Sequence, residues 1–146
     1  MSVRIKSILL VGLQFLLIGL LLAGSSFQKI NLVAAILILT SILLVVWAIA
    51  AMRKSKLSIL PVPSTHAVLI TNGPYHFIRH PMYTAVLSGC TGLVINDFTW
   101  IRLAMFVALA IVLIIKLSWE EKMLMNKFDA YKTYMKHTSG LIPFIF

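Results

Sequence analysis

The stretch LVAAILILTSILLVVWAIAAM, residues 32–52, decides the class of fold to which this chain belongs. Its 21 residues carry no charge. As an α-helix they would be about 32 Å long, enough to cross the ~30 Å hydrocarbon core of a bilayer. The basic run RKSK at positions 53–56 follows directly. This segment is therefore predicted to be a transmembrane helix that ends at the basic run.

Composition extends this interpretation to the whole chain of 146 residues. Hydrophobic residues make up 60% of the sequence and charged residues 12%, and the mean hydropathy is +0.99. These values are far from those of a soluble domain. Apolar runs recur to the end of the chain, unlike a cleaved signal peptide followed by a soluble protein. We expect one integral membrane domain, residues 1–146.

Three further apolar segments complete a predicted all-α bundle of four transmembrane helices. The first, residues 7–23, is apolar apart from Gln14, and a short polar link makes it an antiparallel hairpin with the second. The third, residues 82–96, is only about 21 Å long over its apolar part, so it must be tilted, extended or shielded. The fourth, residues 98–118, carries Arg102 near enough to its start to reach the headgroup region.

The placement of the basic residues predicts the orientation. The net charge is +9, and eleven of the thirteen basic residues precede the first span, lie in the connector 53–81, or follow from Lys116 onward. By the positive-inside rule both termini are cytoplasmic, and a bacterial-type inner membrane is the expected location. Because these residues flank apolar runs, lipid headgroups rather than nucleic acid are the expected anions.

The connector 53–81 and the tail 119–146 are predicted to carry the chemistry. Several prolines and an Asn-Gly pair make the connector a series of turns, with a short extended piece at 67–71 as one option. Its length is typical of a functional segment. Pro81 suits the first turn of the helix that follows, and the residues before it should avoid α geometry.

The tail is predicted to continue the fourth span as a helix. Four side chains recur on one face at helical spacing: Leu124, Phe128, Tyr131 and Met135. We expect this helix to lie on the membrane surface or to fold back over the connector. Gly140 should end it, and the apolar residues 141–146 should pack back into the protein.

Two adjacent acids, Glu120 and Glu121, stand out because the chain has only four acidic residues. They lie at the end of the fourth span, where carboxylates oppose the helix dipole, so a cation should compensate them. Lys116 lies one turn earlier, and the topology places Arg79 and His80 at the same membrane depth. This cluster is either an ion pair that anchors two helix ends or a binding site for a cationic ligand.

A small-residue face on the third span leaves two interpretations open. Ala85, Gly89 and Gly92 share one side of this helix and allow close approach by another helix or by a ligand.

The lone Cys90 is expected to be a packing residue and excludes an intrachain disulfide. Since His66 and His137 lie far apart with no suitably spaced carboxylate, no metal site is expected.

These residues resemble the isoprenylcysteine carboxyl methyltransferase family. The matching elements occur in family order: Gly73-Pro74-Tyr75, Arg79-His80-Pro81-Met82-Tyr83, Glu120-Glu121 and Gly140-Leu141-Ile142-Pro143-Phe144. Membrane phospholipid N-methyltransferases share the Arg-His-Pro and Glu-Glu elements, and some sterol reductases have a related carboxy-terminal half. A phospholipid N-methyltransferase and a nicotinamide-dependent reductase are therefore the alternatives.

The resemblance implies a membrane-embedded methyltransferase that uses S-adenosyl-L-methionine, releases S-adenosyl-L-homocysteine and acts on a lipidic or amphiphilic acceptor. The implied cofactor-binding residues are Tyr75, Arg79, His80, Pro81, Tyr83, Glu120, Glu121, Tyr131 and Tyr134. The residues implied in catalysis are Glu120, Lys116 and Arg79. In this reading the two acids match the cationic charge of the cofactor, and Arg79 matches its carboxylate.

Two features differ from the family members that act on prenylated proteins. Lys116 stands where those members have an arginine, and lysine lacks the bidentate fork that orients a carboxylate. Four spans also leave no counterpart for the longer amino-terminal helices of the eukaryotic members. The acceptor group is left open between a carboxylate, an amine and a thiol.

Overall fold

The computed structural model describes residues 3–52 and 69–142. Its elements are α1 (Val3–Ala23), α2 (Leu32–Ala51), the short 3-10 helix η2 (Gly73–His76), α3 (Pro81–Asn96), α4 (Trp100–Lys127) and α5 (Tyr131–His137). Over the described ranges there is no β-strand, only one isolated β-bridge. The predicted all-α fold is confirmed.

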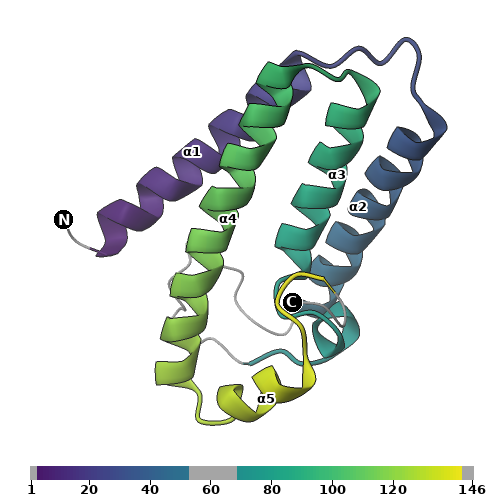
Figure 1. The fold of residues 1–146 in the computed structure, drawn as a ribbon. Helices are drawn as coiled ribbons and strands as arrows, with labels where there is room; N and C mark the ends of the chain where they lie inside the picture. The colour runs from purple at the N-terminus through teal and green to yellow at the C-terminus, as the bar shows by residue number, and fades with distance from the viewer. Residues whose placement is uncertain (1–2, 53–68, 143–146) are drawn as a thin grey trace.

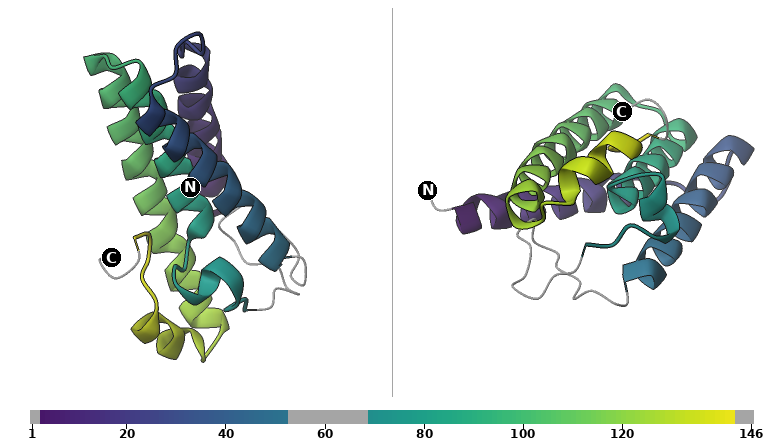
Figure 2. Two further views of the ribbon diagram at one scale, coloured as in Figure 1. Left: turned by 90° about the vertical axis from the view of Figure 1, so that its right-hand side faces the viewer. Right: turned by 90° about the horizontal axis from the view of Figure 1, so that it is seen from below.

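Four long helices form the body of the protein and alternate in direction (Figure 1). Helix α2 packs along α3, α1 packs on α4, and α1 diverges from the other helices toward its N-terminus (Figures 1 and 2). By length and composition, α1, α2 and α4 are able to cross a membrane. Helix α3 has 16 residues, in keeping with the predicted short third segment. The prediction of a helical membrane protein is confirmed, while its orientation in the bilayer stays a prediction.

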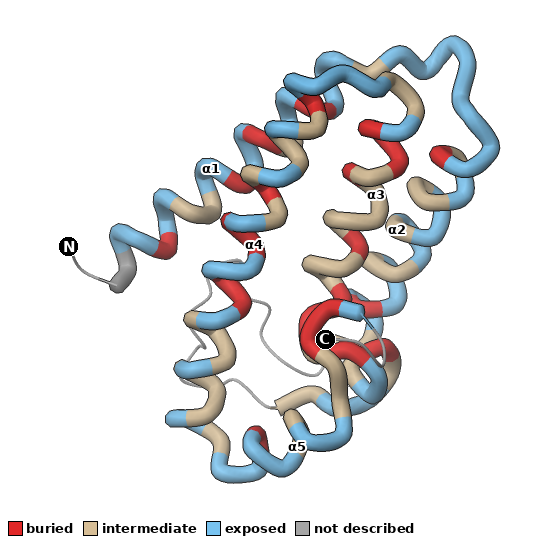
Figure 3. The backbone as a smooth tube through the Cα atoms, in the orientation of Figure 1, coloured by how far each residue is buried: buried red, intermediate tan, exposed pale blue. Residues whose placement is uncertain are grey.

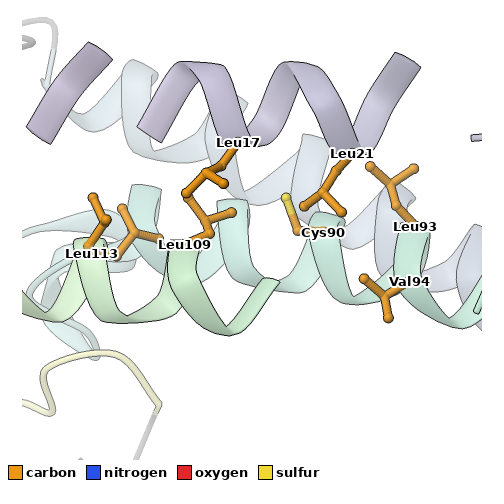
Figure 4. Close-up of a cluster of buried hydrophobic side chains, with 8 residues drawn as sticks. Leu17, Leu21, Cys90, Leu93, Val94, Leu109 and Leu113 are labelled. Carbon is orange, nitrogen blue, oxygen red and sulfur yellow. The ribbon is translucent and has the colours of Figure 1, made fainter. Parts of the chain in front are cut away.

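The distribution of apolar side chains fits helices surrounded by lipid. Large apolar residues such as Leu32 (75% exposed) and Ile101 (69% exposed) lie on the outside, as the exposed stretches of α1 and α2 in Figure 3 show. The buried cluster joins α1, α3 and α4 (Figure 4): Leu17, Leu21, Cys90, Leu93, Val94, Leu109, Val112 and Leu113. The burial of Cys90 in this cluster confirms its predicted packing role.

The small-residue face of α3 packs against α2. A Cβ atom on Gly89 would lie 2.8 Å from Ser41 Oγ, and one on Gly92 would lie 3.0 Å from the Ala34 carbonyl oxygen. The Ser41 hydroxyl also donates a 2.7 Å hydrogen bond to the Ala85 carbonyl oxygen. Since α2 fills this face, helix packing explains the small residues, and their interpretation as an approach for a ligand is wrong.

Arg102 is buried at the opposite end of the bundle from η2 and α5. Its guanidinium donates hydrogen bonds of 3.1 Å to the carbonyl oxygens of Leu21 and Leu93, and one of 2.6 Å to the Ser25 hydroxyl. These carbonyls belong to the last turns of α1 and α3, where a cation is favourable. With only 7% of Arg102 exposed, the prediction that it reaches the headgroup region is wrong.

The turns at this end are also tied together by hydrogen bonds. The Ser26 amide donates to Asp97 Oδ2 and the Asn31 amide to Asn96 Oδ1, each at 2.9 Å. These bonds join the α1–α2 turn to the α3–α4 turn. The predicted site, at η2 and the start of α3, lies at the opposite end of the bundle from these hydrogen-bonded turns (Figure 1).

The tail differs from the predicted continuous helix. Helix α4 ends at Lys127, where Phe128 adopts an extended conformation, and α5 begins only at Tyr131. This break lets α5 turn across the end of the bundle, as the lower part of Figure 1 and the left view of Figure 2 show. The chain leaves helical geometry at Thr138, so Gly140 is not the residue that ends the helix.

Some predictions fall on residues outside the described ranges. Pro61, Pro63 and the start of the proposed extended piece 67–71 belong to them, and residues 69–71 form no strand. Of the apolar terminus 141–146, Leu141 is buried and Ile142 is exposed. The remaining four residues lie outside the described part.

Candidate functional site

The loop before α3 is built by restricted residues. Gly73 has a φ of +62°, a conformation that favours glycine, and a Cβ atom there would lie 3.0 Å from the Ala51 Cβ atom. Pro81 is the first residue of α3, and His80 before it has a non-helical conformation (φ −125°, ψ 61°). Both features agree with the predicted effect of a proline at a helix start. The loop is thus held in one shape directly against the end of α2.

The tail pairs with this loop through backbone hydrogen bonds. Ile78 and Ser139 form an isolated parallel β-bridge. The Arg79 amide donates to the Ser139 carbonyl oxygen at 2.8 Å, and the His80 amide donates to the Gly140 carbonyl oxygen at 3.1 Å. These bonds confirm the option that the tail folds back over the connector. The pairing between the loop and the tail was not predicted from the sequence, because each paired stretch is too short to show the alternation of apolar and polar residues that marks a strand.

Two cationic side chains from the loop meet two carboxylates of α4. Arg79 Nε lies 2.6 Å from Glu121 Oε1. His80 Nδ1 lies 3.5 Å from Glu120 Oε2, and His80 Nε2 lies 3.4 Å from Glu121 Oε1. The latter is a contact between charges and not a well-formed hydrogen bond. The structure therefore brings together the four groups whose convergence the topology predicted.

Arg79 is also a link between α4 and the end of α5. Its Nη1 group donates to the carbonyl oxygen of Met135 at 3.3 Å and to that of Thr138. A guanidinium at this place satisfies carbonyls at the C-terminal end of α5 as well as the Glu121 carboxylate. Much of its hydrogen-bonding capacity is used within the protein.

The four predicted tyrosines lie around this cluster. The Tyr83 hydroxyl donates a 3.0 Å hydrogen bond to Glu120 Oε2, and the Tyr83 ring stacks on His80 with centroids 5.3 Å apart. The Tyr134 hydroxyl donates to the Tyr75 carbonyl oxygen. Tyr131 is 1% exposed, and its hydroxyl has no hydrogen-bond partner among the described residues. An orphaned buried hydroxyl is costly unless a ligand or water completes it.

Lys116 lies deeper in the bundle, where it contacts a residue that was not predicted. Its ammonium donates a hydrogen bond to Gln14 Oε1 of α1 and lies 5.2 Å from the centroid of the Tyr83 ring. Lys116 is 2% exposed and Gln14 8%. The sequence signal was present, because Gln14 interrupts an otherwise apolar span. What the sequence could not give was the pairing of α1 with α4.

The environment of the loop and the tail shifts the pKa values of several groups outside the spans, among them His80 and Tyr134. Burial alone would lower the pKa of His80, but its contacts with Glu120 and Glu121 outweigh burial and raise that pKa above the ordinary value. Burial raises the pKa of Tyr134 to about 12, so its hydroxyl remains a donor. His80 therefore favours the imidazolium form, and the cluster sets two cations against two carboxylates.

Fold and site together define a helical membrane protein with a charged cluster at one end of its bundle. The phospholipid methyltransferase family matches residues 30–131, more than half of the chain. The protein thus belongs to that family of integral-membrane methyltransferases, in which the isoprenylcysteine carboxyl methyltransferases are also placed. No individual curated protein matches the chain. The match includes the loop, α3 and both acids, whereas α1 lies outside it.

Proposed function

We propose that this membrane methyltransferase uses S-adenosyl-L-methionine to methylate a lipidic or amphiphilic acceptor at the end of the bundle formed by the loop, α4 and α5. One observation carries the proposal: Glu120 and Glu121 are gathered with Arg79 and His80 where the tail closes over the loop. A cluster of this kind, at the end of apolar helices, is where an ionic ligand and a lipid can meet.

The residues present fit a cationic cofactor. S-adenosyl-L-methionine carries a sulfonium and an ammonium, for which two carboxylates are complementary, and the unpartnered Tyr131 hydroxyl is available to a polar ligand atom. Glu120, with 29% of its side chain exposed, is more accessible than Glu121, with 12%. The rings of Tyr75, Tyr83 and Tyr134 belong to the same region and suit an adenine. When bound, the cofactor supplies an electrophilic methyl group.

Arg79 has a revised role in this proposal. Its bonds to Glu121 and to two tail carbonyls make it a residue that fixes the second acid and holds the tail over the loop. A contact between Arg79 and the carboxylate of the cofactor stays a prediction. With Pro81 and His80 it sets the start of α3, so these three residues orient the site rather than react.

The protein residues proposed to act on the acceptor are Glu120 and Lys116. A carboxylate or thiolate acceptor attacks without a base, so alignment and the exclusion of water supply most of the rate. An ammonium acceptor must first lose a proton, and Glu120 is the accessible group to take it. Lys116 supplies positive charge for an anionic group of the acceptor.

The description of the matching family favours one of the alternatives. A phospholipid is the acceptor that the family's description names. An amine in its headgroup would receive the methyl group, and its phosphate would suit Lys116 as well as a carboxylate would. A prenylated cysteine carboxylate is the competing acceptor. No observation on the described residues favours the nicotinamide-dependent alternative.

The proposed reaction is tested with labelled cofactor. Purified protein in mixed micelles is given methyl-labelled S-adenosyl-L-methionine and either phosphatidylethanolamine or an S-farnesylated cysteine derivative. Label should appear in one lipid product. If the methylated lipid is phosphatidylethanolamine, Glu120→Gln should reduce the rate by at least about 100-fold, as for loss of a catalytic proton acceptor. The matched control is Asp129→Asn, an exposed acid beyond α4. Label in neither lipid, nor in a total membrane-lipid extract, would contradict the proposal.

A further inference from the structure

Lys116 is a buried residue that makes no close ion pair in the described part of the chain, and Glu120 interacts with its charge only at longer range. It is 2% exposed, and the ion pairs of the cluster do not include it. Glu120, one helical turn onward, has its Oε2 atom engaged by the Tyr83 hydroxyl and by His80. A buried charge is stable only when something else compensates it.

Two side chains contact the Lys116 ammonium in the described part of the chain. Gln14 Oε1 accepts one hydrogen bond, and the face of Tyr83 provides a cation–π contact at 5.2 Å. An ammonium has three donors, so the glutamine leaves donors for a further acceptor. Gln14 is neutral and therefore holds the charge in place without cancelling it.

We propose that Gln14 is a positioning residue of the methyl-transfer site, which holds the Lys116 ammonium so that it can bind an anionic oxygen of the acceptor. This inference rests on the proposed function and adds α1, which lies outside the matched segment, to the functional unit. The ligand chemistry is an amphiphile with a phosphate or carboxylate near the atom that is methylated.

Two substitutions separate positioning from simple helix packing. Gln14→Met keeps the length of the side chain but removes the oxygen that holds Lys116. Gln14→Glu keeps an oxygen and strengthens the link between α1 and α4, but it neutralises the ammonium. A packing role predicts normal behaviour for Gln14→Glu, whereas a positioning role predicts that both variants bind anionic amphiphiles poorly.

Binding is measured by native mass spectrometry, which needs no turnover. The probes are dioleoylphosphatidic acid for the phosphate and oleate for the carboxylate, with dioleoylglycerol as the neutral reference. Both Gln14 variants and Lys116→Met should bind at least one anionic probe about tenfold more weakly, a change of 1.4 kcal/mol. The control Thr40→Val removes an exposed hydroxyl that bonds only within α2 and should bind like the wild type.

Kinetics and cofactor binding complete the test. With the lipid found to be methylated, Gln14→Met should raise KM for the acceptor with little change in kcat. Its affinity for S-adenosyl-L-methionine should be unchanged, so a failure of the proposed cofactor site would be seen separately in the wild type. Wild-type binding of both anionic probes by Gln14→Met and Gln14→Glu would overturn the inference.

Discussion

At the scale of single residues, His80 determines how the site responds to pH. Its two nitrogens face Glu120 and Glu121, and these contacts raise its pKa in the folded protein. A raised folded pKa means that protonation favours folding. The stabilisation is complete below the ordinary pKa of about 6.5 and is lost as the pH rises through the folded value.

The resulting prediction concerns the melting temperature in detergent. For the wild type it should fall as the pH is raised from about 6.5 toward 9, because the imidazolium between the two acids is lost. His80→Gln should melt lower at pH 6 and change less with pH. A wild-type melting temperature that rises over this range would contradict the assigned protonation state.

Arg79 carries a second prediction at the residue scale. Lysine cannot reach Glu121 and two carbonyl oxygens at once, because it lacks the guanidinium fork. Arg79→Lys should therefore lower the free energy of unfolding by about 1–3 kcal/mol and make the tail more sensitive to proteases. The exposed basic residue Lys132 on α5 supplies the control, as Lys132→Gln should have almost no effect.

At the scale of elements, the bundle consists of two helix pairs. The α2–α3 pair depends on small residues in close contact, and the α1–α4 pair carries the Gln14–Lys116 link. The two pairs meet in the apolar cluster of Figure 4. A short α3 is tolerated because α2 covers one side of it along its length (Figure 1).

Glycine substitutions test this packing by the sign of their effects. A Cβ atom at Gly92 would lie 3.0 Å from a backbone oxygen of α2, whereas one at Gly12 would have nothing within 4 Å. Gly12→Ala should stabilise α1 by up to about 1 kcal/mol through helix propensity. Gly92→Ala should destabilise by about 1–3 kcal/mol through overpacking. Thermal unfolding in detergent compares the two, and equal effects would argue against the α2–α3 contact.

At the scale of the whole molecule, much of the architecture could be predicted from the sequence. Long apolar runs require helices in a bilayer, so α1, α2 and α4 correspond to the predicted spans 7–23, 32–52 and 98–118. Helix α2 matches its span to within one residue, whereas α1 begins four residues earlier and α4 continues nine residues beyond the predicted end. The meeting of the loop with Glu120 and Glu121 followed from chain topology and charge. The helices could be predicted from the length of their apolar runs, and the meeting of the loop with the two acids from the number of spans between them.

The failed predictions required knowledge of contacts. The break at Phe128 and the burial of Arg102 depend on the surrounding fold. The pairing of Ser139 with the loop was missing from the predictions for the same reason, although the folding back of the tail was foreseen as one option. The face of Gly89 was consistent with either a helix or a ligand, and only the position of α2 decided between them. The spacing of residues in the sequence shows which face of a helix is lined by small side chains, but it does not identify the helix or ligand that packs on that face.

The measurement that tests the central claim most directly is calorimetric titration of detergent-purified protein with S-adenosyl-L-methionine and S-adenosyl-L-homocysteine. We predict saturable binding of both by the wild type, at least about tenfold weaker binding by Glu121→Gln, and wild-type affinity for Asp129→Asn. No measurable heat of binding for either compound in a folded wild-type sample would contradict the claim that the loop, the two acids and the tail form a cofactor site.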